Sequence, residues 1–495
     1  MSIRRQVSAG TIRRWPLRDV APLPLAPLAF LLATLAGCTT SVGSVSPTSV
    51  AAGGPAFKLT VLGSGFSKGS TVQWNGGNRT TTYVSATELV AQINAADISA
   101  TGSASVTVTD PLATTGTSSS TSGTKTINIV TPSTDAAAYQ IDPAHDGAIT
   151  LGTVSFPSTR DWTANLGAGT PSNIVIADND VFLTVGNSGG SQLLALDWST
   201  GATAWGPKTI AGAADGSTGV AYDSGQVFVA ENASSGSGAL YAYDANTGAL
   251  NWSTDLGATS PGAPTAGDGY VYVIVTGSAT LDALDETTGK IAWQQALSAA
   301  GGTAAVTADG VYVTATTSGC YTIDFRPATG EVIWNSSDGT VYCPQAAAAT
   351  PSVANQSVYS SSAAGTSILD AQTGAGTGTL SDSLPAAFTS DMAYFPESPN
   401  LDAVSLSSNT VQWSFSGDNE LDTPPLVVND QYVITGSSLG HVYALDAASG
   451  GTVWTQTLNG KVEQLAVGDG LLLVVTETGN DAAGTLTAYT IASSQ

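Results

Sequence analysis

The sequence has few of the side chains that support covalent or metal chemistry. It contains 3 cysteines, 2 histidines and 14 lysines plus arginines among 495 residues. No Cys-x-x-Cys-His motif for haem attachment occurs, and His145 and His441 lie in contexts that indicate structural roles. No nucleophile elbow of a serine hydrolase is recognised. Only 11% of residues are charged, and no long amphipathic helical pattern appears, whereas glycine is abundant at 55 residues. This composition predicts an all-β protein.

The first 37 residues are predicted to be a lipoprotein signal peptide. Five arginines precede an apolar run from Val20 to Gly37 that three prolines interrupt. The run ends in Leu-Ala-Gly-Cys at Cys38, which matches the bacterial lipobox and makes Cys38 the expected lipidation site. A membrane-spanning helix and a twin-arginine signal are the alternatives. Thr39 after the lipidated cysteine favours the outer membrane, on its periplasmic face or at the cell surface, with residues 38–44 as a tether.

The two other cysteines, Cys320 and Cys343, flank the strand pair of one repeat. An exported protein folds where disulfides form, so a bridge between them is expected, with two free thiols as the alternative.

Residues 42–130 show alternating apolar and polar residues between Gly, Asn and Ser turns, which predicts a small β-sandwich. The stretches SPTSVAAGG, GSGF (Gly63–Phe66), VQWNG (Val72–Gly76) and SVTV resemble the IPT/TIG immunoglobulin-like domain. That resemblance implies a spacer or adhesive module.

A motif recurs from residue 136 to the end, with a period of about 40 residues. An apolar pair is followed by Asp, two residues, Ser/Thr-Gly, three residues and Trp. It reads LALDWSTGATAW, YAYDANTGALNW, DALDETTGKIAW and YALDAASGGTVW. YTIDFRPATGEVIW is a looser copy with two extra residues expected between Asp324 and Gly330. LDAVSLSSNTVQW has Asn409 in the Gly place, and LDAQTG has Gly378 where Trp belongs.

Each repeat supplies four strands, since Asp-Gly hairpins such as Asp268-Gly269 and Asp309-Gly310 join the first pair and the recurring motif joins the last pair. Seven units and a final one without a Trp strand follow one another. The missing strand is expected at Trp162, so that both ends of residues 136–495 pair in one blade and remove the exposed edges. The sequence predicts an eight-bladed β-propeller of four-stranded blades.

The motif, together with YQIDPAHDGA (Tyr139–Ala148), resembles the PQQ-like, quinoprotein-dehydrogenase-like propeller family. The resemblance implies that the Trp docks neighbouring blades and that Asp and Thr hold the turn. The docking residues are then Trp162, Trp205, Trp252, Trp293, Trp334, Trp413 and Trp454. The turn residues are Asp197 with Gly201, Asp244 with Gly248, Asp285 with Gly289, Asp324 with Gly330, Asp370 with Gly374, and Asp446 with Gly450. The blade with Gly378 is expected to be the loosest.

The propeller is strongly acidic, with 5 basic and 34 acidic residues after residue 130. This balance excludes nucleic-acid binding, which needs cationic patches. Part of the acidity has a structural cause, because carboxylates stabilise turns by accepting amide hydrogen bonds. No metal site is expected, although calcium at the acidic clusters remains an alternative.

The resemblance raises the question of a PQQ enzyme, but the ligands are missing. PQQ is a tricarboxylate, and the propeller offers few cations to bind it. Family enzymes often carry adjacent cysteines, which this chain lacks. We therefore expect no catalytic residues and no cofactor. The leading hypothesis is a membrane-anchored scaffold that binds an envelope protein and resembles the propeller lipoprotein of outer-membrane β-barrel assembly. The alternatives are a surface adhesion or glycan-binding protein and a PQQ-dependent dehydrogenase with calcium.

Overall fold

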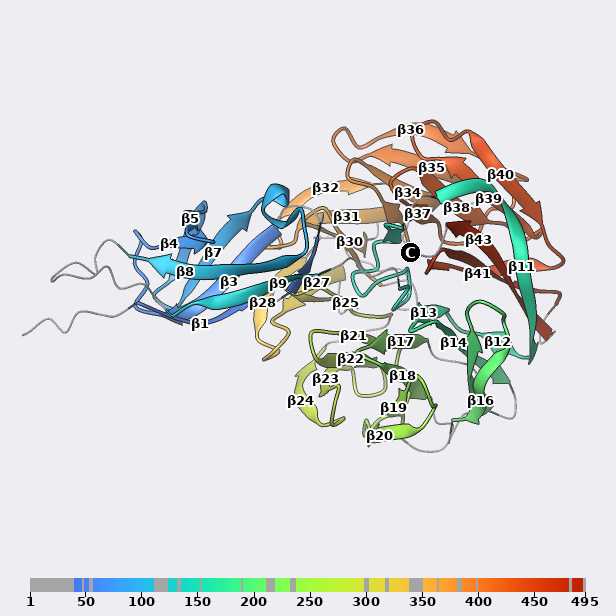
Figure 1. The fold of residues 1–495 in the computed structure, drawn as a ribbon, viewed down its shortest axis with the longest axis horizontal. Helices are drawn as coiled ribbons and strands as arrows, with labels where there is room; N and C mark the ends of the chain where they lie inside the picture. Colours follow the sequence, from blue (N-terminus) through green and yellow to red (C-terminus); the bar gives the residue numbers. More distant parts are fainter. Residues whose placement is uncertain are drawn as a thin grey trace, which may run out of the picture.

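The structure is a computed structural model, and two bodies are visible in it, a small sandwich beside a ring of sheets (Figure 1). It describes residues 40–46, 49–52, 57–110, 123–130, 135–151, 154–187, 190–210, 219–231, 237–297, 302–316, 320–337, 350–362, 365–380, 385–397, 399–479 and 483–492. One 3-10 turn, η1 (Ala95–Ile98), interrupts a series of strands. Within these ranges no helix has the length and apolarity needed to cross a membrane.

The sandwich consists of two sheets that share one apolar core. The first sheet orders β1 (Ser41–Ser46), β3 (Phe57–Ser64), β7 (Glu88–Ile93) and β6 (Thr81–Ser85). The second orders β2 (Ser49–Ala51), β9 (Lys125–Val130), β8 (Gly102–Thr109), β4 (Thr71–Trp74) and β5 (Gly77–Asn78). Inward residues such as Leu59, Trp74 and Val106 fill the space between the sheets, as the alternating sequence predicted.

The ring consists of eight antiparallel blades, and we name the strands of each blade A to D from the centre outward. The first three blades are β13 (Val175–Ala177) with β12 (Thr170–Pro171), β14 (Asp180–Asn187), β15 (Gly190–Asp197) and β16 (Thr203–Thr209); then β17 (Val220–Asp223), β18 (Gln226–Glu231), β19 (Ala239–Asp244) and β20 (Leu250–Asp255); then β21 (Thr265–Gly267), β22 (Tyr270–Val275), β23 (Thr280–Asp285) and β24 (Ile291–Ala296). The fourth, fifth and sixth blades are β25 (Ala305–Val306), β26 (Val311–Thr316), β27 (Cys320–Phe325) and β28 (Val332–Ser337); then β29 (Ser352–Ala354), β30 (Ser357–Ser362), β31 (Gly365–Asp370) and β32 (Gly376–Leu380); then β33 (Ala387–Phe388), β34 (Met392–Glu397), β35 (Asn400–Ser405) and β36 (Thr410–Phe415). The seventh blade is β37 (Leu426–Val428), β38 (Tyr432–Gly436), β39 (His441–Asp446) and β40 (Thr452–Thr457), and the eighth is β41 (Lys461–Gly468), β42 (Leu471–Glu477), β43 (Ala483–Ala492) and β11 (Val154–Ala168).

The ring closes by pairing its two ends. Strand β11, which precedes the first blade in sequence, is the D strand of the eighth blade and pairs with β43 from Val154–Ala492 to Ala168–Ala483. Closure of this kind leaves no blade without its fourth strand. The predicted fold, including the place of Trp162, is confirmed.

The tryptophans lie between blades, each against the C–D turn of the next blade. The indole Nε1–H of Trp205 donates to the Ala245 carbonyl at 2.6 Å, and that of Trp162 donates to the Trp198 carbonyl at 2.8 Å across the closure. Equivalent bonds join Trp252 to Glu286, Trp293 to Pro327, Trp334 to Ala371 and Trp413 to Ala447. Trp454, whose neighbouring blade has no such turn, instead packs against Phe156 and Tyr489.

In five of the C–D turns the Asp of the motif accepts from the Thr or Ser three residues later. In the first blade, Oδ1 of Asp197 accepts from the Thr200 amide and hydroxyl at 2.9 and 2.7 Å. The turn glycine has a positive φ, +68° at Gly201, and the Trp162 ring lies so close that an added Cβ would be 2.3 Å from Cε3. Two features therefore require glycine here: the positive φ of the backbone and the close approach of the Trp162 ring.

The structure corrects the reading of the fourth blade, where Asp324 was expected to be the turn residue. Gly330 N–H donates to the Arg326 carbonyl, as Gly201 N–H donates to that of Asp197, so Arg326 occupies the Asp position and no residues are inserted. Asp324 lies inside β27, paired with Tyr312 and Trp334, and is 2% exposed. The Asp-Gly hairpin of this blade also differs from the prediction, since four residues, not two, separate β25 from β26.

The two irregular repeats meet at one interface. Gly378, in the Trp place of the fifth blade, faces the turn of the sixth blade, and a Cβ there would lie 3.1 Å from Asn409 Nδ2. Asn409 occupies the glycine position with φ of +53°, and its amide keeps the turn bond to the Ser405 carbonyl. Without an overlying indole, the turn accommodates a side chain.

Candidate functional site: the central channel and the turn face

The central channel is crossed by the protein's own chain. The A strands of neighbouring blades contact each other around the centre, and residues 136–149, drawn in teal in Figure 1, run inside them. This channel segment makes backbone hydrogen bonds to six blades. They link Ala136 to Ile176, Ala137 to Tyr222, Pro143 to Val306, Ala144 to Val353, Asp146 to Phe388, and Gly147 to Val427. It ends as β10 (Ala148–Ile149), which pairs in parallel with β37.

The channel segment turns sharply around a buried carboxyl. The Asp142 side chain accepts from the backbone amides of Asp146, His145 and Ala144, and burial nevertheless raises the pKa of Asp142 to about 6. Gln140, Ile141 and His145 all have positive φ, which is costly for a β-branched residue such as Ile141. The fixed pattern of bonds to the blades holds this strained path.

Burial also shifts the pKa values of the other titratable groups of the segment toward their uncharged forms. Burial lowers the pKa of His145 to about 4, and Nδ1 of its ring lies 3.3 Å from the Pro351 carbonyl while Nε2 has no partner. Burial and then the charge of Asp142 raise the pKa of Asp146, and burial raises the pKa of Tyr139 to about 12. The channel segment carries no Lys or Arg, and burial disfavours the charged forms of its titratable groups.

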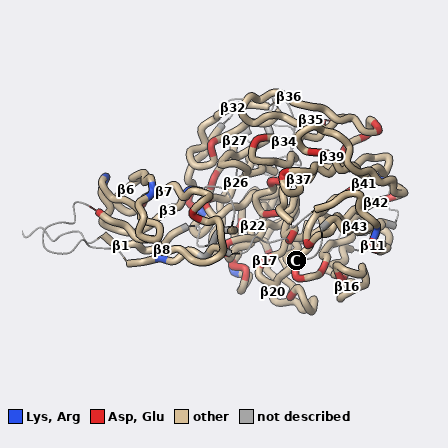
Figure 2. Tube along the Cα trace, turned by 45° about the horizontal axis from the view of Figure 1, so that its top comes forward, with Lys and Arg blue, Asp and Glu red and all other residues tan. Residues whose placement is uncertain are grey.

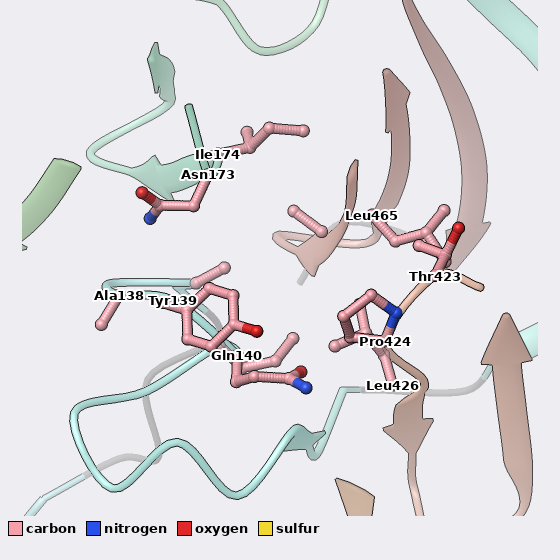
Figure 3. Close-up of a pocket in the computed structure, with 12 residues that line it drawn as sticks. Ala138, Tyr139, Gln140, Asn173, Ile174, Thr423, Pro424, Leu426 and Leu465 are labelled. Carbon is pink, nitrogen blue, oxygen red and sulfur yellow. The ribbon is translucent and has the colours of Figure 1, made fainter. Parts of the chain in front are cut away.

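Described residues of the channel segment and of three blades line a small cavity. A cavity of about 20 Å³ lies between the segment and the seventh, eighth and first blades, lined among others by Tyr139, Gln140, Asn173 and Thr423. Figure 3 shows the Gln140 amide and the Tyr139 ring directed toward Thr423, Pro424 and Leu426 across the gap. Such a volume suits one or two water molecules.

The residues present do not fit PQQ. The cofactor is a tricarboxylate, whereas the titratable groups of the channel segment are Tyr139, Asp142, His145 and Asp146. The five cations of the propeller lie elsewhere, in β11 (Arg160), β16 (Lys208), β41 (Lys461) and two C–D turns (Lys290 and Arg326). Nor does any group of three or more Asp, Glu, His or Cys in the described ranges form a metal site.

One side of the ring, which we call the turn face, carries both the A–B hairpins and the C–D turns. Backbone bonds join the two turns of a blade, for example from Ala245 N–H to the Gly225 carbonyl. Seven of the eight A–B hairpins contain an aspartate at or beside the turn, and the fifth blade has Asn355 instead. The aspartates are Asp178, Asp223, Asp268, Asp309, Asp391, Asp430 and Asp469. Figure 2 shows acidic positions distributed around the ring.

Burial and nearby carboxylates raise the pKa of three of these aspartates, so they hold their protons more tightly than isolated carboxyls; the three are Asp268, Asp309 and Asp430. Burial and then the neighbouring Asp268 raise the pKa of Asp309 to about 7, and burial and Asp223 raise that of Glu286 to about 7. The pKa of Asp324 rises to about 9 through burial and Asp309. The formal charge of −24 therefore overstates the charge carried near neutral pH.

The opposite face holds the second histidine. Nδ1 of His441 and the Ser437 hydroxyl both lie 2.6 Å from Oδ2 of Asp418. A serine nucleophile must be bonded to the histidine, which in turn is oriented by the carboxylate, and here the serine bonds to the carboxylate. The residues Gly436–Gly440 do follow a Gly-x-Ser-x-Gly pattern that the sequence reading overlooked. They join β38 to β39, however, and form no strand-to-helix elbow.

Two predicted sites cannot be placed. Cys38 and Cys343 lie outside the described residues, and of Cys320 only the backbone position at the start of β27 is described. Lipidation and the disulfide stay predictions.

Taken together, the chain is an eight-bladed propeller preceded by an immunoglobulin-like sandwich, with a channel crossed by its own chain and an acidic face. The family model described as "Outer membrane protein assembly factor BamB" matches residues 191–394 and 397–494, over half of the chain, so the protein belongs to this propeller family. The IPT/TIG domain model matches residues 41–127.

Solved structures share the fold. BamB from Moraxella catarrhalis is 19% identical, with a TM-score of 0.52 over 69% of this chain and 99% of that one. The quinohemoprotein alcohol dehydrogenase ADHIIG from Pseudomonas putida HK5 is 14% identical, with a TM-score of 0.59 over 73% and 81%. A europium-containing methanol dehydrogenase has the same identity and TM-score over 72% and 98%. No curated protein matches the sequence significantly. Membership of the family leaves open whether this chain is an enzyme, because the fold is common to both kinds of relative.

Proposed function

We propose that the protein is a non-catalytic scaffold that binds another protein in the bacterial cell envelope. The observation that carries the proposal is the channel segment. It crosses the centre of the ring with backbone bonded to six blades and carries no Lys or Arg, which favours the outer surface for binding. Family membership supports the same function, since the family is described by its part in outer-membrane protein assembly.

The scaffold is proposed to be held at the outer membrane through a lipid on Cys38, on the periplasmic face. The basis is the lipobox sequence and the residue that follows it. Cys38→Ser is expected to abolish metabolic labelling with palmitate and to leave the signal peptide uncleaved, so that the protein has the larger mass of the precursor. Palmitate labelling that persists in this variant would contradict the anchor. Protection of the parent protein from protease added to intact cells would place it inside the envelope, while digestion would favour the surface adhesion reading that the IPT/TIG domain suggests.

The binding function is tested by photo-crosslinking in living cells. A crosslinking amino acid at the exposed turn-face residue Thr247 is compared with one at Leu439, which is 58% exposed on the opposite face. The proposal predicts a discrete adduct with an envelope protein from one of these faces, identified by mass spectrometry. Absence of protein adducts from both, together with specific retention of a sugar or a quinone, would refute it.

A further inference from the structure

The sandwich meets the ring where the repeat pattern changes. Nζ of Lys58, in β3, lies 2.6 Å from Oε1 of Gln372, in the C–D turn of the fifth blade. The Arg326 guanidinium, in the C–D turn of the fourth blade, lies 3.8 Å from the Glu88 carboxylate at the start of β7. Figures 1 and 2 both show the sandwich beside this part of the ring, outside its centre.

Arg326 is the residue that departs most sharply from the repeat. The equivalent residue in the other C–D turns is Asp or Ser, as at Asp285, Asp370 and Ser405. The neighbouring fifth blade also lacks the hairpin aspartate and has Asn355. At the place where Glu88 approaches, Arg326 thus puts a cation where the repeat usually has an acidic residue, which removes repulsion and supplies attraction.

Each domain contributes both a cation and an acidic group to the contact. Lys58 comes from a sandwich with nearly balanced charge and lies close enough to Asp309 to lower its pKa, against the larger effects of burial and Asp268. The side chains of Arg326 and Glu88 are 27% and 24% exposed, so this pair is partly withdrawn from solvent. An exposed surface pair contributes little, whereas a partly desolvated pair with a second polar contact specifies an orientation.

The connection between the domains is short. Four residues separate Val130, the end of β9, from Asp135, next to Ala136 in the channel. At about 3.5 Å per residue, this link cannot reach far. The sandwich is therefore tethered near the ring and needs only weak contacts to be held in one position, because the effective concentration is high.

We propose that Arg326 with Glu88, and Lys58 with Gln372, form a docking interface that fixes the sandwich at one angle on the fourth and fifth blades. The partner of this surface is the chain's own sandwich. The protein is then one rigid unit that holds the propeller at a set orientation relative to its N-terminal end, and this holds whatever the propeller binds.

The test measures the distance between the domains in the full-length protein. Spin labels carried by non-canonical amino acids replace Val84 in the sandwich and Leu250 in the second blade, which are 51% and 53% exposed. Double electron–electron resonance of the parent is expected to give one narrow distance distribution. Arg326→Asp, which restores the residue typical of the repeat, is expected to broaden it and add longer distances. Lys290→Asp makes the same change of charge in the turn of the third blade, beside Asp285, and is expected to leave it narrow.

Exchanging the two charges tests whether the broadening comes from loss of the pair or from misfolding of a single variant. Arg326→Glu combined with Glu88→Arg is expected to restore the narrow distribution that either single change broadens. A broad distribution in the parent, an unchanged one in Arg326→Asp, equal broadening by Lys290→Asp, or failure of the exchange to restore it would each overturn the proposal.

Discussion

At the scale of single residues, the turn glycines serve two purposes that the sequence does not distinguish. Gly289 has φ of +68°, and an added Cβ would lie 2.4 Å from Cε3 of Trp252. Gly225, in an A–B hairpin, has φ of +79° but no heavy atom within 4 Å of the added Cβ. Both look alike in the sequence, and only the first lies beneath an indole ring.

Alanine substitution separates the two purposes. Gly225→Ala is expected to cost about 1 kcal/mol, from backbone strain alone. Gly289→Ala adds displacement of the Trp252 ring, and a total of about 3 kcal/mol is expected. Chemical denaturation followed by tryptophan fluorescence measures both. Equal losses would mean that the ring does not depend on a bare glycine.

Asp324 was misassigned because the sequence D-F-R-P-A-T-G offers an aspartate near the expected position. The turn is set by where the Trp and Gly lie, and the hydrogen bonds place Arg326 there. Asp324 is a buried carboxyl whose pKa is raised to about 9 by burial and by Asp309.

The raised pKa makes stability depend on pH in a defined direction. A carboxyl with a folded pKa above its unfolded value of 3.8 stabilises the fold fully only below that value, and this contribution is lost as pH rises toward the folded pKa. Together with Asp309 and Glu286, whose pKa values are near 7, Asp324 is expected to make the melting temperature fall from pH 6.5 to pH 9. Asp324→Asn should reduce this slope.

The control for this series is Asp285→Asn. Hydrogen bonds from Thr288 lower the pKa of Asp285, so its contribution changes only on the acid side and the slope above pH 6.5 should be that of the parent. Thermal melts at several pH values give the comparison. A parent slope retained in Asp324→Asn would contradict the assignment of Asp324 as a protonated buried group.

At the scale of elements, the interface between the fifth and sixth blades is a variant of the regular one. The regular interface places a Trp on a turn Gly, as Trp334 lies on Gly374. The variant places Gly378 against Asn409, and the Tyr359 and Phe388 rings, with centroids 4.3 Å apart, fill part of the core there. The sequence showed both departures, but their relation appeared only when the blades were seen side by side.

The regular interface can be rebuilt by two changes made together. Gly378→Trp alone is expected to destabilise the protein, because the indole meets the Asn409 side chain. With Asn409→Gly added, the loss should be recovered, with a favourable coupling of about 1–3 kcal/mol in a double-mutant cycle. Denaturation of the four proteins in the cycle measures it. Additive effects would show that the two residues do not share an interface.

At the scale of the whole molecule, the repeat allowed the fold to be predicted from the sequence. The path of the channel segment was not predicted. Blade number, closure at Trp162 and the all-β class follow from a period that the sequence displays. Tyr139–Ala148 has no period and no alternation. Its path depends on single hydrogen bonds to strands that are far away in sequence, such as those to Val306 in β25 and to Val427 in β37. The candidate site therefore had to come from the structure.

The channel segment also affects what the centre of the ring can bind. An alcohol dehydrogenase and a methanol dehydrogenase are among the solved structures that share this fold. In this chain the centre is crossed by backbone bonded to six blades, and the crossing segment carries no Lys or Arg. This observation is the basis for proposing that partners bind on the faces of the ring.

The most direct test of this account is a calorimetric titration of the purified protein with PQQ in the presence of calcium, beside a quinoprotein dehydrogenase stripped of its cofactor as a positive control. The account predicts no saturable heat and no change in tryptophan fluorescence for this protein, while the control binds. Stoichiometric binding that a substitution in the channel segment, such as Gln140→Ala, weakens would contradict it.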